Sequence, residues 1–550
     1  MNRTTYLLLL PVLWMGCTAP STSEHPWKPY DESAALAAQA EHENVRMRYQ
    51  LIQSRLSNPQ HVWGAFHEAL DAFGAAKYEE LKPLILEQDF PSLQGHVASG
   101  KLTYEDLTTF YLYRMRKLEW DSTKTLHAVL ALNPLAIEEA AACDAQRDKA
   151  SHPIFGMPLL LKDNINTSTM PTTAGAAILE NHYPPQDAHI VDRLTSKGAI
   201  ILGKVNLSEW AYYFCDDCPL GYSAIGGQTL NPYGRMQFET GGSSAGSGVA
   251  VAANYAAAAI GTETSGSILS PSSKNAVVGL KPTVGLASRS GIVPISSTLD
   301  TPGPMTRFVI DNAIVLDAMA GPDASDAATL AAPADRNFLH AVLNSDLEGV
   351  RLGALAELMA SDSLYRQAVA DLRAAGAVVV ECSPPEVDLN GFLSVLNGDM
   401  RRDLPAYFQS SSAPEVSMLD VAAVMTFNRA DSALRMPYGQ ARLEGIVSDS
   451  ISDEALRALI DTLHTRCRSF FDEPMQTLEL EGLISINNYH AAYAALAFYP
   501  GISVPMGYTA EGEPAGLTLF APSHHEFELL GWAAGYEAQT RHRRLPSGYE

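Results

Sequence analysis

The chain has 550 residues, and its 38 Lys and Arg against 62 Asp and Glu give a formal net charge of −24 at pH 7. Apolar residues make up 46% of the sequence and charged residues 18%, which is typical of a globular protein and excludes an intrinsically disordered chain. A charge this negative repels phosphate groups, and no run of Lys or Arg offsets it locally, so we expect no nucleic-acid partner.

The first 16 residues predict a signal peptide for export. Arg3 gives a positively charged start, residues 6–15 form an apolar stretch too short to span a bilayer, and the chain becomes polar after Cys17. The pair Gly16-Cys17 resembles the processing site of bacterial lipoproteins, in which the Cys is lipidated and becomes the new N-terminus. We therefore expect a periplasmic lipoprotein that contacts the membrane only through the lipid on Cys17. If an ordinary signal is cut elsewhere, the protein is secreted.

Residues 17–30 predict a linker, and residues 31–150 predict an N-terminal helical region, with apolar residues spaced by three and four positions. From residue 151 to residue 550, short apolar runs alternate with helical stretches, which is typical of an α/β domain. Residues 384–454 are less regular and predict a helical insertion over the sheet. We expect strands at the apolar runs 158–161, 199–202, 256–260, 350–354, 377–380, 483–486, 502–504 and 517–519.

Cys215 and Cys218 have the spacing of a local disulfide, a redox dithiol or half of a zinc site. No second pair of this kind and no spaced His pair completes a zinc site, so we expect no bound metal. A disulfide suits an exported protein, and two reduced thiols are the alternative, which the sequence leaves open. The remaining cysteines are Cys17, Cys143, Cys382 and Cys467.

Two loops of small residues lie at 240–248 and 261–267. Neither has the spacing of a P-loop or of a dinucleotide-binding fingerprint, so a nucleotide site is disfavoured. The first loop also fits the GxSxG pattern of α/β-hydrolases, in which Ser244 would be the nucleophile and a downstream His such as His490 its base. That pattern requires a buried strand immediately before it, whereas the preceding residues are polar and rich in turn formers, so we treat the match as accidental.

Several motifs follow one another in a fixed order between residues 162 and 505. They are Lys162-Asp-Asn-Ile, Gly203-Lys-Val-Asn-Leu-Ser-Glu-Trp210, Gly241-Gly-Ser-Ser-x-Gly-Ser, Gly261-Thr-x-x-x-Gly-Ser-Ile268, Val278-Gly-Leu-Lys-Pro-Thr-x-Gly285, Asp300-Thr-x-Gly-Pro-Met305 and Pro500-Gly-Ile-Ser-Val-Pro505. In order and character the chain resembles the amidase signature family over about residues 95–545. The resemblance implies an α/β/α sandwich with a central mixed sheet and an N-terminal helical region.

The resemblance also implies a catalytic trio of Lys162, Ser243 and Ser267, with a cis peptide bond before Ser243. Ser267 would attack the amide, and Ser243 would pass its proton to Lys162, which must be neutral. An unperturbed Lys has a pKa of about 10.4, and burial lowers it. Amide hydrolysis further needs donors for the oxyanion, which the family supplies from backbone N–H groups. By resemblance these are the N–H groups of Thr264, Ser265, Gly266 and Ser267.

Two residues depart from the commonest form of the nucleophile loop. Ser265 stands where the family most often has Gly, and Leu269 stands where it most often has Arg. A subgroup with Gly-Thr-Glu-Thr-Asp-Gly-Ser, which includes peptide amide hydrolases, is closer to this chain. The departures lie beside the predicted oxyanion hole, so they bear on substrate preference and rate more than on reaction class.

The expected function is therefore an exported amidase that hydrolyses linear carboxamide C–N bonds through an acyl-enzyme. The substrate would be a small-molecule or peptide amide, the products an acid and ammonia or an amine, and no metal or organic cofactor is needed. Export and net charge disfavour a role as an aminoacyl-tRNA amidotransferase subunit. The alternatives are a non-catalytic amide-binding lipoprotein and an esterase with the same site. The sequence does not specify the oligomeric state.

Overall fold

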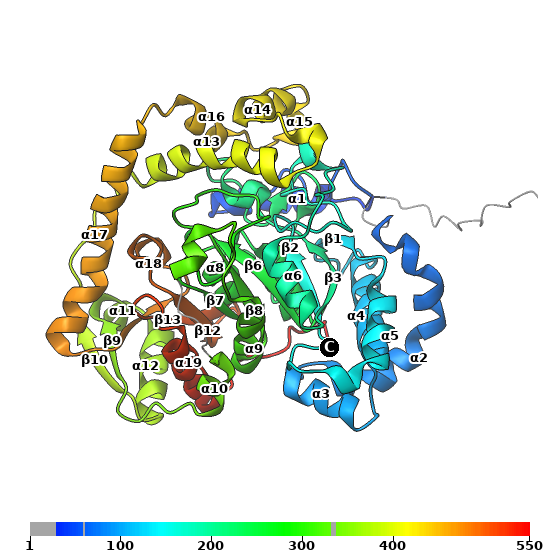
Figure 1. The fold of residues 1–550 in the computed structure, drawn as a ribbon, viewed down its shortest axis with the longest axis horizontal. Coiled ribbons are helices and arrows are strands. Elements are labelled where there is room, and N and C mark those ends of the chain that lie inside the picture. The colour runs from blue at the N-terminus through cyan, green and yellow to red at the C-terminus, as the bar shows by residue number, and fades with distance from the viewer. Residues whose placement is uncertain (1–28, 59–60, 332–336) are drawn as a thin grey trace, which may run out of the picture.

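The computed structural model describes residues 29–58, 61–331 and 337–550 (Figure 1). The signal peptide, Cys17 and residues 17–28 of the expected linker lie outside the described residues. The centre of the fold is an eleven-stranded sheet. In spatial order its strands are β1 (Val129–Leu132), β3 (Ile200–Val205), β2 (Pro158–Lys162), β6 (Ala258–Glu263), β8 (Thr301–Thr306), β7 (Val278–Lys281), β12 (Gly501–Tyr508), β13 (Pro514–Phe520), β11 (Gly482–Ile486), β9 (Arg351–Leu355) and β10 (Val378–Cys382).

The sheet is mixed, as the resemblance implied. β2 runs parallel to β3 and β6, and β9 runs parallel to β10 and β11, whereas the strands between these groups pair antiparallel. All eight apolar runs identified in the sequence form strands. The mixed α/β fold is thus confirmed.

β8 was not expected, because Pro302 and Pro304 interrupt its apolar pattern. Proline cannot donate to a strand ladder and is tolerated where one side of the strand is unpaired. β8 pairs with β6 along its whole length, but β7 reaches only Met305 and Thr306. The two prolines therefore lie where the β7 side of β8 is open.

Two groups of helices pack against the strands. In the first group α7 contacts α8, and both contact the sheet. In the second group α9 and α19 contact each other, α10 contacts both of them, α6 contacts α9, and α12 contacts α19. Their bounds are α6 (His189–Ser196), α7 (Ala245–Ala252), α8 (Leu269–Lys274), α9 (Val309–Met319), α10 (Phe338–Leu343), α12 (Ser363–Ala374) and α19 (Glu526–Thr540).

The N-terminal region is helical except for β1. Its helices are α1 (Ser33–Gln39), α2 (His67–Ile85), α3 (Phe90–Ala98), α4 (Tyr104–Glu119) and α5 (Ala136–Ala145). Thr103 caps the start of α4, because its side chain accepts the N–H of Asp106, and most residues of this helix are buried. β1 pairs antiparallel with β3, so the sheet crosses the boundary that we drew at residue 150.

Residues 384–454 form mainly helices, as expected. α13 (Phe392–Ser411), α14 (Val421–Arg429), α15 (Ser432–Arg435) and α16 (Ala441–Ser448) lie together at the top of Figure 1, and we call them the helical cover. The long α17 (Asp453–Leu478) leads from the cover back to β11. Tyr407 of α13 donates to Asn166 Oδ1 at 2.7 Å, four residues beyond the end of β2. The cover therefore rests on a loop at the carboxyl end of that strand.

No helix in the described part of the chain is long and apolar enough to cross a bilayer.

Candidate active site

Lys162 is the last residue of β2 and is completely buried. Its Nζ lies 2.8 Å from Ser243 Oγ, 2.8 Å from Thr262 Oγ1 and 3.1 Å from the Thr262 carbonyl oxygen. A neutral amine has two N–H donors and one lone pair. If Nζ donates both protons to Thr262, its lone pair accepts the hydroxyl proton of Ser243, which is the arrangement that a proton relay requires.

Burial lowers the pKa of Lys162 to about 7, although the negative charges of Asp300 and Glu263 act in the opposite direction. The Lys162 side chain is therefore neutral in a substantial fraction of the molecules near pH 7. A buried ammonium group with only oxygen dipoles around it would be costly, and the neutral amine removes that cost.

Ser243 is buried, and its peptide bond to Gly242 is cis, as the resemblance implied. The Ser243 carbonyl accepts the N–H of Ser208 at 3.0 Å, and the next N–H, of Ser244, donates to the Ser267 carbonyl at 3.1 Å. These two bonds fix the Ser243 backbone beside the Ser267 loop. The structure thus brings together all three residues of the predicted trio.

Ser267 lies in the turn between β6 and α8 and is partly exposed. Its hydroxyl has no hydrogen-bond partner among the described residues, so it is free to turn toward Ser243 or toward a substrate. Gly266, immediately before it, has a φ of +94°, and a Cβ there would lie 3.0 Å from Asn488 Nδ2. The positive φ therefore favours glycine at this position, and a side chain there would also crowd Asn488.

Glu263 organises this loop, a role that the sequence reasoning missed. Its buried carboxylate accepts three backbone N–H groups, those of Gly266 at 2.7 Å, Ile268 at 2.6 Å and Leu269 at 2.9 Å. The loop therefore winds around one carboxylate. The sequence did carry a signal for this role, because Glu263 is an ionisable residue in a glycine-rich motif that directly follows an apolar run.

One of the four predicted oxyanion donors, the N–H of Gly266, is wrong. The N–H of Gly266 is already bonded to Glu263 Oε1, so it is not free for an oxyanion. The N–H groups of Thr264, Ser265 and Ser267 have no partner within the described residues. Three of the four predicted donors thus remain available.

Asp300 supports the loop from the other side. Its carboxylate accepts the Thr264 hydroxyl at 2.5 Å and the N–H groups of Ile295 and Ser296. Burial raises the pKa of this carboxyl to about 6. Thr264 and Asp300 line a small cavity together with Asn164 and Thr262, whose hydroxyl lies 2.8 Å from Lys162 Nζ.

A groove of about 650 Å³ adjoins this cavity and shares Arg289, Ile292 and Asp300 with it. Six Asp side chains line it against one Arg, and that residue, Arg289, is paired with Asp326. Its negative charge disfavours anionic ligands. The other acidic residues of the groove are Asp187, Asp192, Asp323 and Asp403.

The α/β-hydrolase interpretation of Ser244 is wrong. The Ser244 hydroxyl is buried and bonded to the backbone of Thr262, at 3.0 Å to its oxygen and 3.2 Å from its nitrogen. His490 instead lies 2.6 Å from Ser485 Oγ and stacks on Phe470, and burial lowers its pKa to about 4. Neither residue has the contacts of a nucleophile or its base.

Comparison with known proteins identifies the family. The sequence profile of the Amidase family matches residues 106–397, slightly more than half of the chain. A probable amidase of Arabidopsis thaliana is 35% identical over 464 residues, which cover 81% of this chain and 88% of the relative. The chain belongs to the amidase signature family. The expected resemblance is confirmed, and the protein is an amide hydrolase.

Solved structures of the amidase family agree with this assignment. An amidase family protein of Bacillus anthracis is 33% identical, with a TM-score of 0.86, over 90% of this chain and 99% of that one. The peptide amidase of Stenotrophomonas maltophilia is 38% identical, with a TM-score of 0.78, over 84% of this chain and 98% of that one.

The two departures from the usual amidase loop leave its contacts intact. Leu269 is buried, begins α8 and gives its N–H to Glu263, so its backbone serves the loop whatever its side chain. Ser265 is partly exposed, and its N–H is free among the described residues. Neither change removes a contact of Lys162, Ser243 or Ser267.

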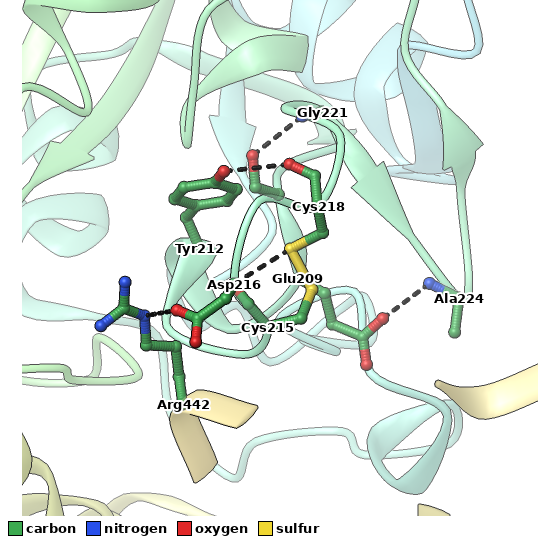
Figure 2. The surroundings of a disulfide bond; sticks show 9 residues. Glu209, Tyr212, Cys215, Asp216, Cys218, Gly221, Ala224 and Arg442 are labelled. Carbon is green, nitrogen blue, oxygen red and sulfur yellow. Dashed lines mark hydrogen bonds and ion pairs between the residues drawn. A yellow bond between two sulfur atoms is a disulfide. The ribbon is translucent and has the colours of Figure 1, made fainter. Parts of the chain in front are cut away.

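Cys215 and Cys218 form a disulfide, and Cys143, Cys382 and Cys467 are free thiols (Figure 2). Of the two alternatives that the sequence left open, the structure has the bonded one. The described ranges hold no group of three or more His, Cys, Asp or Glu side chains arranged to bind a metal ion.

Proposed function

We propose that this amidase hydrolyses linear carboxamides with Ser267 as nucleophile, Ser243 as proton relay and Lys162 as base. The observation that carries the proposal is the 2.8 Å contact between Lys162 Nζ and Ser243 Oγ in a fully buried position. A lysine placed there can accept a proton only if its pKa is depressed, and burial lowers it to about 7.

The proposed proton path uses the contact between Lys162 and Ser243. As Ser267 Oγ attacks the amide carbon, its proton passes to Ser243 Oγ, and the Ser243 proton passes to Lys162 Nζ. The free N–H groups of Thr264, Ser265 and Ser267 stabilise the oxyanion. When the C–N bond breaks, Ser243 protonates the leaving nitrogen and recovers a proton from Lys162. Water then attacks the Ser267 ester, the relay operates again, and a carboxylic acid is released.

We propose neutral or cationic amides as substrates, among them peptide amides, because the acidic groove repels anions. The 38% identity to a peptide amidase supports this class. Ammonia release from matched peptide amides, fatty amides and short aryl amides tests it, with anionic analogues expected to react most slowly. Activity on esters with none on the matched amides would instead favour the esterase alternative.

Labelling with a fluorophosphonate tests the site separately from any substrate. We expect one phosphonate on Ser267 and none in Ser267→Ala, which would also exclude a non-catalytic binding protein. The labelling rate should rise with pH through about 7 and then level off, because Lys162 becomes a base as it loses its proton. Mass spectrometry of the labelled peptide gives the position. Labelling at Ser244, or a rate independent of pH between 6 and 9, would contradict the assignment.

We further propose that the protein is exported and anchored by a lipid on Cys17, with no nucleic-acid partner. The sequence of the first 17 residues supports this proposal. Cys17→Ala should shift the protein from the membrane fraction to a soluble or uncleaved exported form and remove the mass of the acyl chains. Unchanged fractionation together with unchanged mass would reject the anchor.

A further inference from the structure

The Cys215–Cys218 disulfide closes a turn whose Asp216 pairs with Arg442 of the helical cover (Figure 2). Both cysteines are buried, whereas the Asp216 side chain between them is more than half exposed. We call residues 213–218 the clasp turn. Its residues contact the helical cover, whereas the bonds that hold Ser243 are made by other residues.

On the cover side, the clasp turn makes polar contacts with two helices. Arg442 of α16 places its Nε 2.7 Å from the Asp216 carboxylate, and its backbone N–H donates to the Phe214 carbonyl at 3.1 Å (Figure 2). The Tyr213 hydroxyl donates to Asn397 Oδ1 of α13 at 2.6 Å. The clasp turn is therefore one attachment of the cover to the catalytic domain, in addition to the contact between Tyr407 and Asn166.

Toward the catalytic residues, the chain before and after the clasp turn is held by bonds of Ser208. Ser208 donates its N–H to the Ser243 carbonyl at 3.0 Å, and Ser208 Oγ accepts the N–H of Gly221 at 2.8 Å. Neither bond involves a residue of the clasp turn. The two bonds that hold Ser243 and Ser208 are thus made outside the clasp turn, whereas the contacts of Tyr213, Phe214 and Asp216 with the cover are made within it.

We propose that the Cys215–Cys218 disulfide positions the helical cover for substrate binding, so that its reduction weakens substrate affinity while the catalytic step is retained. The inference rests on the proposed function, because it places the substrate between the cover and Ser267. Reduction by an added dithiol transfers two electrons and two protons to the bond. Two Cys thiols form, and the dithiol becomes a disulfide.

The expected result is a rise in KM of about fivefold on reduction, with kcat unchanged within about twofold. A fivefold change corresponds to about 1 kcal/mol, the scale of an exposed ion pair together with one hydrogen bond. A purely structural bond would change thermal stability without this split between KM and kcat. The double variant Cys215→Ser/Cys218→Ser should show the same KM in the absence of dithiol.

Thiol counting in denaturant accompanies the kinetics. With Cys17 acylated, the protein should show three thiols without reductant and five after dithiol treatment. Five thiols before treatment would mean that the bond is absent and would overturn the proposal. An unchanged KM in protein with five thiols, or a fall in kcat at constant KM, would overturn it as well.

Asp216→Asn serves as a second probe, because it removes the ion pair with Arg442 and leaves the disulfide in place. It should raise KM and make the further effect of dithiol smaller than in the parent, since both act on the same contact. Cys143→Ser, at a partly exposed thiol that belongs neither to the turn nor to the catalytic trio, should keep the full response to dithiol. Loss of the response in Cys143→Ser would contradict the assignment to the clasp turn.

The inference and the proposed function can fail separately. If the oxidised protein hydrolyses no amide and no fluorophosphonate labels Ser267, the proposed function fails. If the oxidised protein is active and labelled but reduction leaves KM unchanged, only the role of the clasp turn fails.

Discussion

Lys162→Met and Ser267→Ala are each expected to lower kcat/KM by at least about 10³-fold, the scale seen when one member of a cooperating catalytic unit is lost. Met keeps the volume of the buried side chain and removes the amine that lies 2.8 Å from Ser243 Oγ. Ser243→Ala should be similarly severe, because it removes the hydroxyl that passes the proton to the lysine in the proposed path. Ammonia release gives the rates, and circular dichroism with thermal unfolding checks that each variant folds.

His490→Gln is the matched control for a base of a different kind. His490 contacts Ser485 and Phe470 rather than a member of the trio, so its loss should cost less than about tenfold. Near-normal turnover in Lys162→Met together with a large loss in His490→Gln would refute the lysine as base.

The sequence could predict the trio because its members lie in three ordered motifs, and the structure places Lys162 against Ser243 and Ser243 beside the Ser267 loop. It also predicted eight of the eleven strands of the central sheet, those at the apolar runs named above. β1, β7 and β8 were not predicted. Prolines occupy the open side of β8, β7 is a four-residue strand that contains Gly279, and β1 is a four-residue strand that follows a helical region. These misses share a physical reason, since all three strands are stabilised by pairing with distant partners more than by their own pattern.

The fate of individual N–H groups could not be predicted from the sequence. Whether Gly266 donates to an oxyanion or to Glu263 depends on how the loop winds, which the order of residues does not specify. The disulfide was likewise undecided, because spacing permits both a bond and two thiols. The contacts of the clasp turn with Arg442 depend on where α16 lies, more than 200 residues further along the chain.

Glu263→Gln is expected to lower kcat by about 10²-fold, comparable to the loss of one oxyanion-hole donor. The carboxylate oxygens accept three N–H groups, and a Gln in either orientation would turn its NH₂ group toward at least one of them. The loop that carries Ser267 would then shift, and a displacement of about 1 Å is enough for a loss of this size.

The pH dependence of activity distinguishes a role of Glu263 in the active site from a general loss of stability in Glu263→Gln. The negative charge of Glu263 raises the pKa of Lys162, so its removal should lower that pKa and move the rising limb of activity to more acidic pH. Glu513→Gln, which breaks an ion pair with Lys274 at the far end of α8, should leave both kcat and the limb unchanged. A Glu263→Gln enzyme with parental kcat and an unmoved limb would show that the carboxylate neither holds the nucleophile loop nor acts on the lysine.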